Sequence, residues 1–139
     1  MAKIYQYQKV SDDYTEYRVS GEGVTELTTI DGITYISVGG ELPAYDPQLV
    51  VTETVLTDDL RGWIKAASPH TILINQRMQE KIRAAYSAED EAYYARIGVG
   101  VALGAYAFEP GEQEDLLAFG AFVESVRQWG RDQRAELGL

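Results

Sequence analysis

The sequence contains no cysteine and a single histidine, His70, in 139 residues. Without cysteine, disulfides, zinc-thiolate sites and thiol nucleophiles are excluded. One histidine cannot form a histidine-rich metal site, and no serine occurs in a G-x-S-x-G motif. Composition alone therefore removes the commonest nucleophilic and thiolate-metal chemistries from consideration.

Positive charge is also scarce. The chain has 12 lysines and arginines against 22 aspartates and glutamates, which gives a formal net charge of −10. Binding to nucleic acid or to an acidic membrane surface needs a clustered basic surface. We therefore predict no nucleic-acid partner and no membrane partner. The longest weakly polar run, residues 97–108, is too short to span a bilayer, so we expect a soluble product made in the cytoplasm.

β-branched and aromatic residues dominate the first forty positions, and turn-forming residues interrupt them. Asp31-Gly32 is the signature of a two-residue type I′ hairpin. Since residues of a strand alternate between faces, the strand after this hairpin carries apolar groups on both, with Tyr35 on one face and Ile36 on the other. Such a small sheet needs a cover. The pattern predicts strands at residues 4–10, 14–19, 24–30 and 33–38.

Capping residues mark the helix starts. Thr57 precedes one helix, Ser68-Pro69 a second, and Ser87 a third, with Asp90 in the capping-box position. Residues 97–108 are apolar nearly all round, which predicts that the third helix is the central one. Trp129 is predicted to be a core anchor of the last helix. The spacing of apolar residues predicts helices over residues 60–67, 69–86, 87–108 and 112–137.

These patterns predict an α+β fold, with a small N-terminal antiparallel β-meander followed by a C-terminal bundle of three to four helices. Glycines 39 and 40 and prolines 43 and 47 interrupt the pattern between the two parts. We predict a β-rich subdomain with a proline-containing linker at residues 1–47 and a helical subdomain at residues 48–139. The alternative is one compact unit in which the helices cover the sheet.

Several groups invite a chemical interpretation, and each has a structural one. His70 lies in the first turn of a helix, where a capping or surface role is expected. Acidic clusters such as Glu89-Asp90-Glu91 and Glu112-Gln113-Glu114-Asp115 stand at helix starts, where the helix dipole favours negative charge without any chemistry. The glycines at 98, 100 and 104 do not match a dinucleotide-binding loop. We therefore predict no catalytic residue, no cofactor and no metal site.

Tyrosine is abundant, with ten copies. It supplies contact area at low entropic cost and is enriched at protein interfaces. Packing in the core and on the sheet is the alternative role for these side chains. The candidate interaction residues are Tyr5, Tyr7, Tyr14, Tyr17, Tyr35, Tyr93 and Tyr94.

Two stretches in the helical half of the chain contain sequence motifs that resemble those of a known group of proteins. One is A-S-P-H-T-I-L-I-N-Q-R-M-Q-E-K-I-R-A-A-Y-S-A-E-D-E, which begins at Ala67, and the other is F-V-E-S-V-R-Q-W-G-R-D-Q-R-A-E-L-G-L at residues 122–139. Together they resemble small proteins of bacteriophage and prophage tail modules, from the tail-fibre or baseplate region. The middle segment, I-G-V-G-V-A-L-G-A, is more apolar than that pattern.

This resemblance implies a structural or adaptor component of a phage tail, at the tail tip, baseplate or fibre attachment site, acting through protein-protein contacts. It implies other phage tail proteins as partners, a homo-oligomer or several copies in an assembly, and a place in the virion tail after synthesis in the host bacterial cytoplasm. One alternative is a tail-fibre assembly chaperone that is absent from the mature virion. Another is a carboxylate-based hydrolase, which needs two acidic side chains converging in a pocket.

Overall fold

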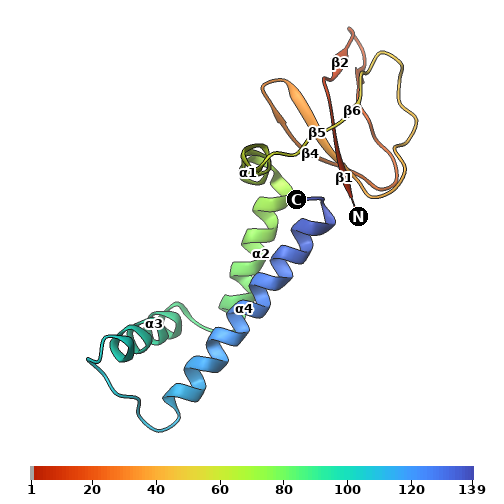
Figure 1. Cartoon of the computed structure of the whole chain (residues 1–139). Coiled ribbons are helices and arrows are strands. Elements are labelled where there is room, and N and C mark those ends of the chain that lie inside the picture. Colours follow the sequence, from red (N-terminus) through yellow and green to blue (C-terminus); the bar gives the residue numbers. More distant parts are fainter. Residues whose placement is uncertain (1) are drawn as a thin grey trace. The chain divides into compact units, whose positions relative to one another are not determined.

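The computed structural model describes residues 2–139 and has an α+β fold, as the sequence predicts (Figure 1). Within that range, six strands come first and four helices follow. The strands are β1 (Lys3–Tyr7), β2 (Val10–Ser11), β3 (Glu16–Tyr17), β4 (Val24–Ile30), β5 (Ile33–Val38) and β6 (Thr52–Glu53). The helices are α1 (Asp58–Ala67), α2 (Pro69–Ala85), α3 (Ala88–Ala102) and α4 (Glu112–Glu136).

The main sheet is antiparallel with the strand order β4-β5-β1-β6, and β2 and β3 form a separate pair. Strand β1 therefore lies between β5 and β6 rather than following the chain order of a simple meander. The strand most buried on both faces, β5, thereby gains a neighbour on each side. The predicted hairpin between β4 and β5 is confirmed, because Asp31 and Gly32 have φ of 50° and 79°.

The predicted strand at residues 4–10 is broken into β1 and β2, and the one at residues 14–19 shortens to β3. Between β2 and β3 the Asp12 carboxylate accepts hydrogen bonds from the backbone N–H groups of Tyr14 and Thr15, each at 2.8 Å. A side chain that bonds its own local backbone in this way closes a tight turn at the expense of strand pairing. Strand propensity alone therefore overestimates the length of both strands.

Both faces of the main sheet are covered. One face holds the buried cluster Tyr7, Val19, Ile36, Val38 and Leu49. The other holds Ile4, Leu27, Tyr35 and Ile64, with Leu60 of α1 and the C-terminal Leu137 and Leu139 packed against them. Because Tyr35 and Ile36 face opposite ways, the sheet needs these covers, and α1 supplies one of them through Ile64, which is fully buried.

Contacts group the chain into two compact units. The sheet unit comprises Met1–Ile74 and Asp132–Leu139, and the helical unit comprises Asn75–Arg131. Their boundary falls inside α2 and α4 and differs from the predicted division between residues 47 and 48. The physical reason is the second face of β5, which is covered by α1 and the C-terminal leucines rather than by the first 47 residues.

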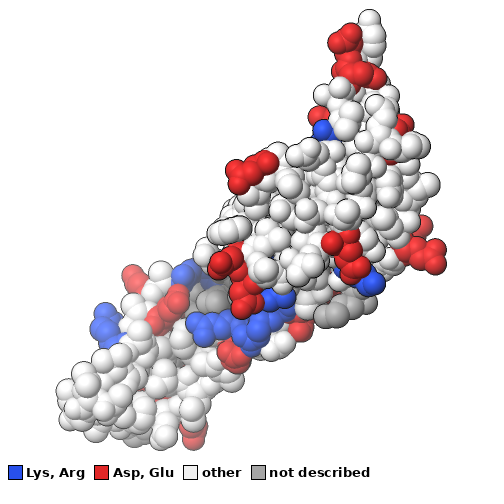
Figure 2. Space-filling model, turned by 45° about the horizontal axis from the view of Figure 1, so that its top comes forward, with Lys and Arg blue, Asp and Glu red and all other residues white. Residues whose placement is uncertain are grey.

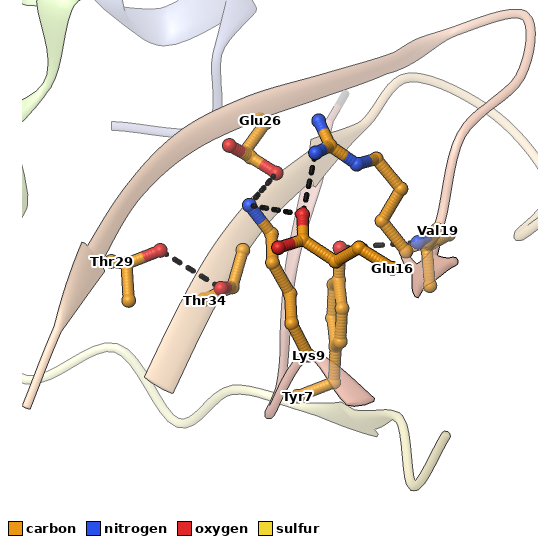
Figure 3. A network of polar contacts seen from close by, with 8 residues as sticks. Tyr7, Lys9, Glu16, Val19, Glu26, Thr29 and Thr34 are labelled. Carbon is orange, nitrogen blue, oxygen red and sulfur yellow. Dashed lines mark hydrogen bonds and ion pairs between the residues drawn. The ribbon is translucent and has the colours of Figure 1, made fainter. Parts of the chain in front are cut away.

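A polar network links the β2-β3 pair to the edge strand β4 (Figure 3). Lys9 Nζ lies 2.9 Å from Glu26 Oε1 and 4.0 Å from Glu16 Oε1. Beside this network the backbone N–H of Val19 donates a hydrogen bond to the Tyr7 hydroxyl oxygen at 3.1 Å. Tyr7 is thus fixed in the core by its ring and its hydroxyl together.

In the helical unit, α2 and α4 run antiparallel, because their contacts occur in opposite order along the two helices. Lys81 Nζ lies 4.6 Å from the centre of the Trp129 ring, and the Tyr86 ring lies 4.9 Å from that of Phe119. Gly130 of α4 lies beside Met78 of α2. A Cβ atom at position 130 would collide with the Met78 sulfur. Gly130 therefore allows the close approach of α4 to this side chain.

Three helical predictions need correction. Helix α3 is not a buried central helix: Ile97 is buried, but Val99 and Leu103 are 58% and 77% exposed. An apolar composition all round a helix does not determine which of its faces packs inward. The helix also ends at Ala102 rather than at residue 108, because Gly104 adopts φ of +72°. Trp129 is half-buried beneath Lys81 rather than a core anchor.

Candidate functional site

One end of the helical unit is formed by α3 and by the segment that connects α3 to α4. Helix α3 starts with the predicted capping box: the Asp90 N–H donates to Ser87 Oγ at 3.0 Å, and the Ser87 N–H donates to Asp90 Oδ2 at 2.9 Å. After the helix, the N–H groups of Ala105 and Tyr106 both donate to the Gly100 carbonyl oxygen. The chain therefore folds back against the last turn of α3.

Gly100 is required for this return. A Cβ atom at this position would lie 2.9 Å from Tyr106 Cβ, which is closer than real side chains approach. The positive φ of Gly104, +72°, turns the chain just after the helix.

The Glu112 carboxylate joins the two ends of the connection. Glu112 is 9% exposed, and its Oε1 accepts hydrogen bonds from the Tyr106 hydroxyl at 2.6 Å and from the Glu109 N–H at 2.7 Å. Its Oε2 accepts a hydrogen bond from the Tyr93 hydroxyl of α3. One carboxylate thus connects α3, the connection and the first turn of α4.

These contacts shift the titration of the groups involved. Hydrogen bonding to Glu112, with a smaller effect of burial, raises the pKa of Tyr93 and the pKa of Tyr106 to about 12. The bonds from Tyr106 and Tyr93 and from the Glu109 N–H lower the pKa of Glu112. At neutral pH the carboxylate is ionised and both tyrosines are protonated. None of the three groups therefore changes its protonation state near neutral pH.

An aromatic cluster packs α3 against the rest of the helical unit. The rings of Tyr94 and Phe119 stack with centroids 4.9 Å apart, and Tyr86 contacts both in edge-on geometry. Aromatic pairs at such distances add to the burial of their surface. Together with Ile97 they determine which face of α3 points inward.

The opposite face of α3 is exposed and apolar. Ala95, Val99, Ala102 and Leu103 follow helical spacing and are all exposed. Leu117 on α4 is 65% exposed as well. Figure 2 shows a broad area without charged residues at its lower left, where α3 lies in Figure 1. We call Ala95, Val99, Ala102 and Leu103 the α3 stripe.

The stretch of sequence that contains this stripe is acidic. Residues 88–126 contain one basic residue, Arg96, and eight carboxylates, so this stretch carries seven of the ten net negative charges of the chain. The connection and the start of α4 hold half of these carboxylates. They are Glu109, Glu112, Glu114 and Asp115.

The Glu112 carboxylate accepts hydrogen bonds from three donors. Within residues 2–139, no group of three or more histidines or carboxylates lies close enough together to hold a metal ion. In the same range, no helix is both long and apolar enough to cross a membrane.

One hollow in the sheet unit, of about 330 Å³, is comparable with the smallest ligand pockets. Amide, hydroxyl and apolar side chains line it, and no carboxylate, lysine or histidine does. It offers hydrogen bonds but no acid or base suited to hydrolysis. Its lining residues are Gln6, Tyr7, Gln8, Val10, Ile33, Gln48, Val50 and Thr52.

The tyrosines singled out from the sequence do not form one surface. Tyr7 and Tyr35 are 2% and 8% exposed and belong to the two core clusters of the sheet unit. Tyr5 and Tyr17 pack against the first of these clusters. In the helical unit, Tyr93 bonds Glu112 and Tyr94 stacks on Phe119. Tyr14 is 97% exposed in the turn between β2 and β3.

His70 is exposed, and its backbone N–H donates a hydrogen bond to Ser68 Oγ at 3.3 Å in the first turn of α2. The sequence analysis gave Glu112 only a helix-dipole role within an acidic cluster, and it did not single out Val99 or Leu103. For Val99 and Leu103 the sequence shows only that residues 97–108 carry no charge, and the same pattern equally fits a buried helix. The sequence gives no sign of the bond between Glu112 and Tyr93, because the two residues lie 19 positions apart.

Comparison of the chain with protein-family models, curated proteins and solved structures gave no match.

Proposed function

We propose that this chain is a structural or adaptor component of a phage tail that acts through protein-protein contacts. The observation that carries the proposal is the exposure of Val99 and Leu103, four positions apart on one side of α3. Apolar side chains presented together on a surface commonly mark an interaction site. The Glu112 bonds and the aromatic cluster hold this surface in place, so a partner meets a preformed shape.

The phage assignment rests on the resemblance of α2 and of the end of α4 to proteins of phage tail modules. It gives the tail tip, the baseplate or the fibre attachment site as the place of action, with other tail proteins as partners and several copies in the particle. Synthesis takes place in the host bacterial cytoplasm, and the product is retained in the virion tail.

The second candidate is a tail-fibre assembly chaperone. The same exposed surface supports it, because a chaperone must cover an apolar segment of its client and then release it. Such a surface stays uncovered in the free protein, whereas an adaptor covers it permanently in the particle. The two functions therefore differ in whether the chain remains in the finished virion.

Quantitative mass spectrometry of purified tails or virions, from the phage or lysogen that carries the gene, tests the proposal. An adaptor is recovered at a fixed multiple of the other tail proteins. A chaperone is recovered with fibre proteins in the lysate and is lost from the particles. Absence from both the particles and every complex with a tail protein contradicts the phage-tail assignment.

A further inference from the structure

The hollow in the sheet unit lies where strand pairing between β1 and β6 stops. The last pair of this antiparallel ladder is Gln6 with Thr52. In the same register, two positions further along, Gln8 would pair with Val50. These two residues lie outside both strands, and both line the hollow of about 330 Å³. The hollow is therefore a gap in the ladder, opened where the two segments diverge.

The main-chain groups of Gln8 face this gap. Alternate residues of an antiparallel strand direct their N–H and C=O groups toward the same neighbour. On the β6 side of β1, the Ile4 carbonyl oxygen accepts a hydrogen bond from the Thr54 N–H at 2.8 Å. The main-chain groups of Gln6 and Gln8 follow on that side. Within residues 2–139, neither Gln8 nor Val50 makes a hydrogen bond to another backbone group outside the strands. An unpaired edge of this kind is a template for another extended chain.

The side chains around the gap are uncharged. Gln6, Gln8 and Gln48 supply amide groups, and each amide both donates and accepts hydrogen bonds. Thr52 adds a hydroxyl, and Ile33 adds an apolar side chain. A charged ligand would lose its hydration in this lining without gaining an ionic partner. The lining therefore favours a neutral ligand that carries both donors and acceptors.

Charged residues next to the lining in sequence have partners of their own. They are Lys9 with Glu26 at 2.9 Å, Glu53 with Lys3 at 3.9 Å, and the Asp46 carboxylate with the Gln48 N–H at 2.9 Å. Asp31, two positions before Ile33, lies in the exposed hairpin turn. None of these groups belongs to the lining of the hollow.

We propose that this gap binds a short, uncharged and extended peptide segment of a partner chain. The segment adds main-chain hydrogen bonds at Gln8 and Val50, and the glutamine amides bond its remaining peptide groups. Addition of a strand to a free edge is a general mode of peptide recognition. The inference rests on the protein-protein contacts of the proposed function and names the chemistry of one partner segment. It does not depend on the exposed face of α3.

A carbohydrate is a poorer occupant of the same hollow. Amide side chains would bond its hydroxyl groups, but a sugar also needs an apolar ring face on which to rest. Tyr7 is the only aromatic residue of the lining, and it is 2% exposed. Its ring belongs to the buried cluster of the sheet unit. The unpaired strand edge has no use for a sugar, whereas it matches a peptide main chain.

The test titrates the full-length, ¹⁵N-labelled chain with three probes and follows its amide resonances by NMR. The first probe is the acetylated and amidated peptide Thr-Val-Thr-Val-Thr. The second is the same peptide N-methylated at every residue, which removes its main-chain donors, and the third is glucose. We expect the first peptide to shift the resonances of Gln8, Val50 and Thr52. The N-methylated peptide should bind at least about tenfold more weakly, and glucose should leave these resonances unchanged.

Variants then locate the site. Gln8→Leu removes one amide at an exposed position and should weaken binding of the first peptide about three- to tenfold. Val50→Pro removes the main-chain donor of a residue that is 77% exposed, and it should weaken binding to a similar extent. The matched control is Gln113→Leu, at an exposed glutamine of the helical unit. This control should leave the affinity unchanged.

Three results would overturn the proposal. The first is the absence of any shift at Gln8, Val50 and Thr52 with the first peptide at millimolar concentration. The second is equal binding of the N-methylated peptide, which would mean that main-chain hydrogen bonds play no part. The third is a response to glucose alone, which would make the hollow a carbohydrate site.

These outcomes are separate from the mass spectrometry of particles. A chain that is retained in virions but ignores the peptide keeps the proposed function and loses this site. A chain that binds the peptide but is absent from particles and from complexes with tail proteins keeps this site and loses the phage-tail assignment.

Discussion

The hydroxyl of Tyr106 donates a 2.6 Å hydrogen bond to the Glu112 carboxylate, and this contact closes the connection between α3 and α4. Tyr93 donates to the other oxygen of the same carboxylate. One ionised group therefore serves two tyrosines that lie on different segments. The strength of these two hydrogen bonds depends on pH, and this dependence can be measured at both acidic and alkaline pH.

Acid should loosen this end of the helical unit. The pKa of Glu112 is lowered in the folded chain, first by the bond from Tyr106, so its contribution is present above its ordinary pKa near 4.5 and is lost as the pH falls through the folded value. We expect Glu112→Gln to melt at a lower temperature than the unmodified chain at neutral pH. Thermal melts followed by circular dichroism should show this difference shrinking at acidic pH. A constant difference across this range contradicts the role assigned to Glu112.

Alkali should act on the two tyrosines. Their pKa is raised to about 12 from an ordinary value of 10.0, so their contribution is complete below the ordinary value and is lost as the pH rises toward the folded one. Ultraviolet titration of tyrosine absorbance should therefore show a late phase. Tyr106→Phe should reduce that phase, whereas Tyr14→Phe, at a residue 97% exposed, should leave it intact. An unchanged late phase in Tyr106→Phe would refute the assignment.

Two glycines of α4 should respond oppositely to alanine. At Gly130 a Cβ atom would collide with Met78, so Gly130→Ala should destabilise the chain by about 1–3 kcal/mol, the range for overpacking. At Gly120 nothing lies within 4 Å, and Gly120→Ala should stabilise by about 0.5–1 kcal/mol through helix propensity. Urea denaturation of both variants measures the difference. Equal effects would mean that α2 and α4 do not approach closely at Met78.

Adjacent residues of α1 separate core from surface. Ile64 is 0% exposed beneath the sheet and Trp63 is 60% exposed. Ile64→Ala should cost about 2–5 kcal/mol, the range for large-to-small changes in a core. Trp63→Ala should change stability by no more than about 0.5 kcal/mol. Chemical denaturation followed by circular dichroism provides the comparison. A small cost at Ile64 would detach α1 from the sheet unit and favour the division at residues 47 and 48.

Local features of the fold could be predicted from the sequence because a few neighbouring residues decide them. The hairpin at Asp31-Gly32, the caps at Thr57 and Ser87 and the α+β class all follow from turn, capping and periodicity rules. The end of α3 was missed by six positions, since an uncharged apolar run contains no marker for the point at which Gly104 turns the chain.

Features that depend on distant residues were decided by tertiary packing. The position of β1 between β5 and β6 follows from the need to pair and cover a strand that is apolar on both faces. The candidate surface on α3 arises in the same way: Tyr94 and Ile97 pack inward, which leaves Val99 and Leu103 outside. The sequence determined that residues 97–108 carry no charge. Whether that run is buried or exposed depends on the free energy of packing against α4, which only the folded chain expresses.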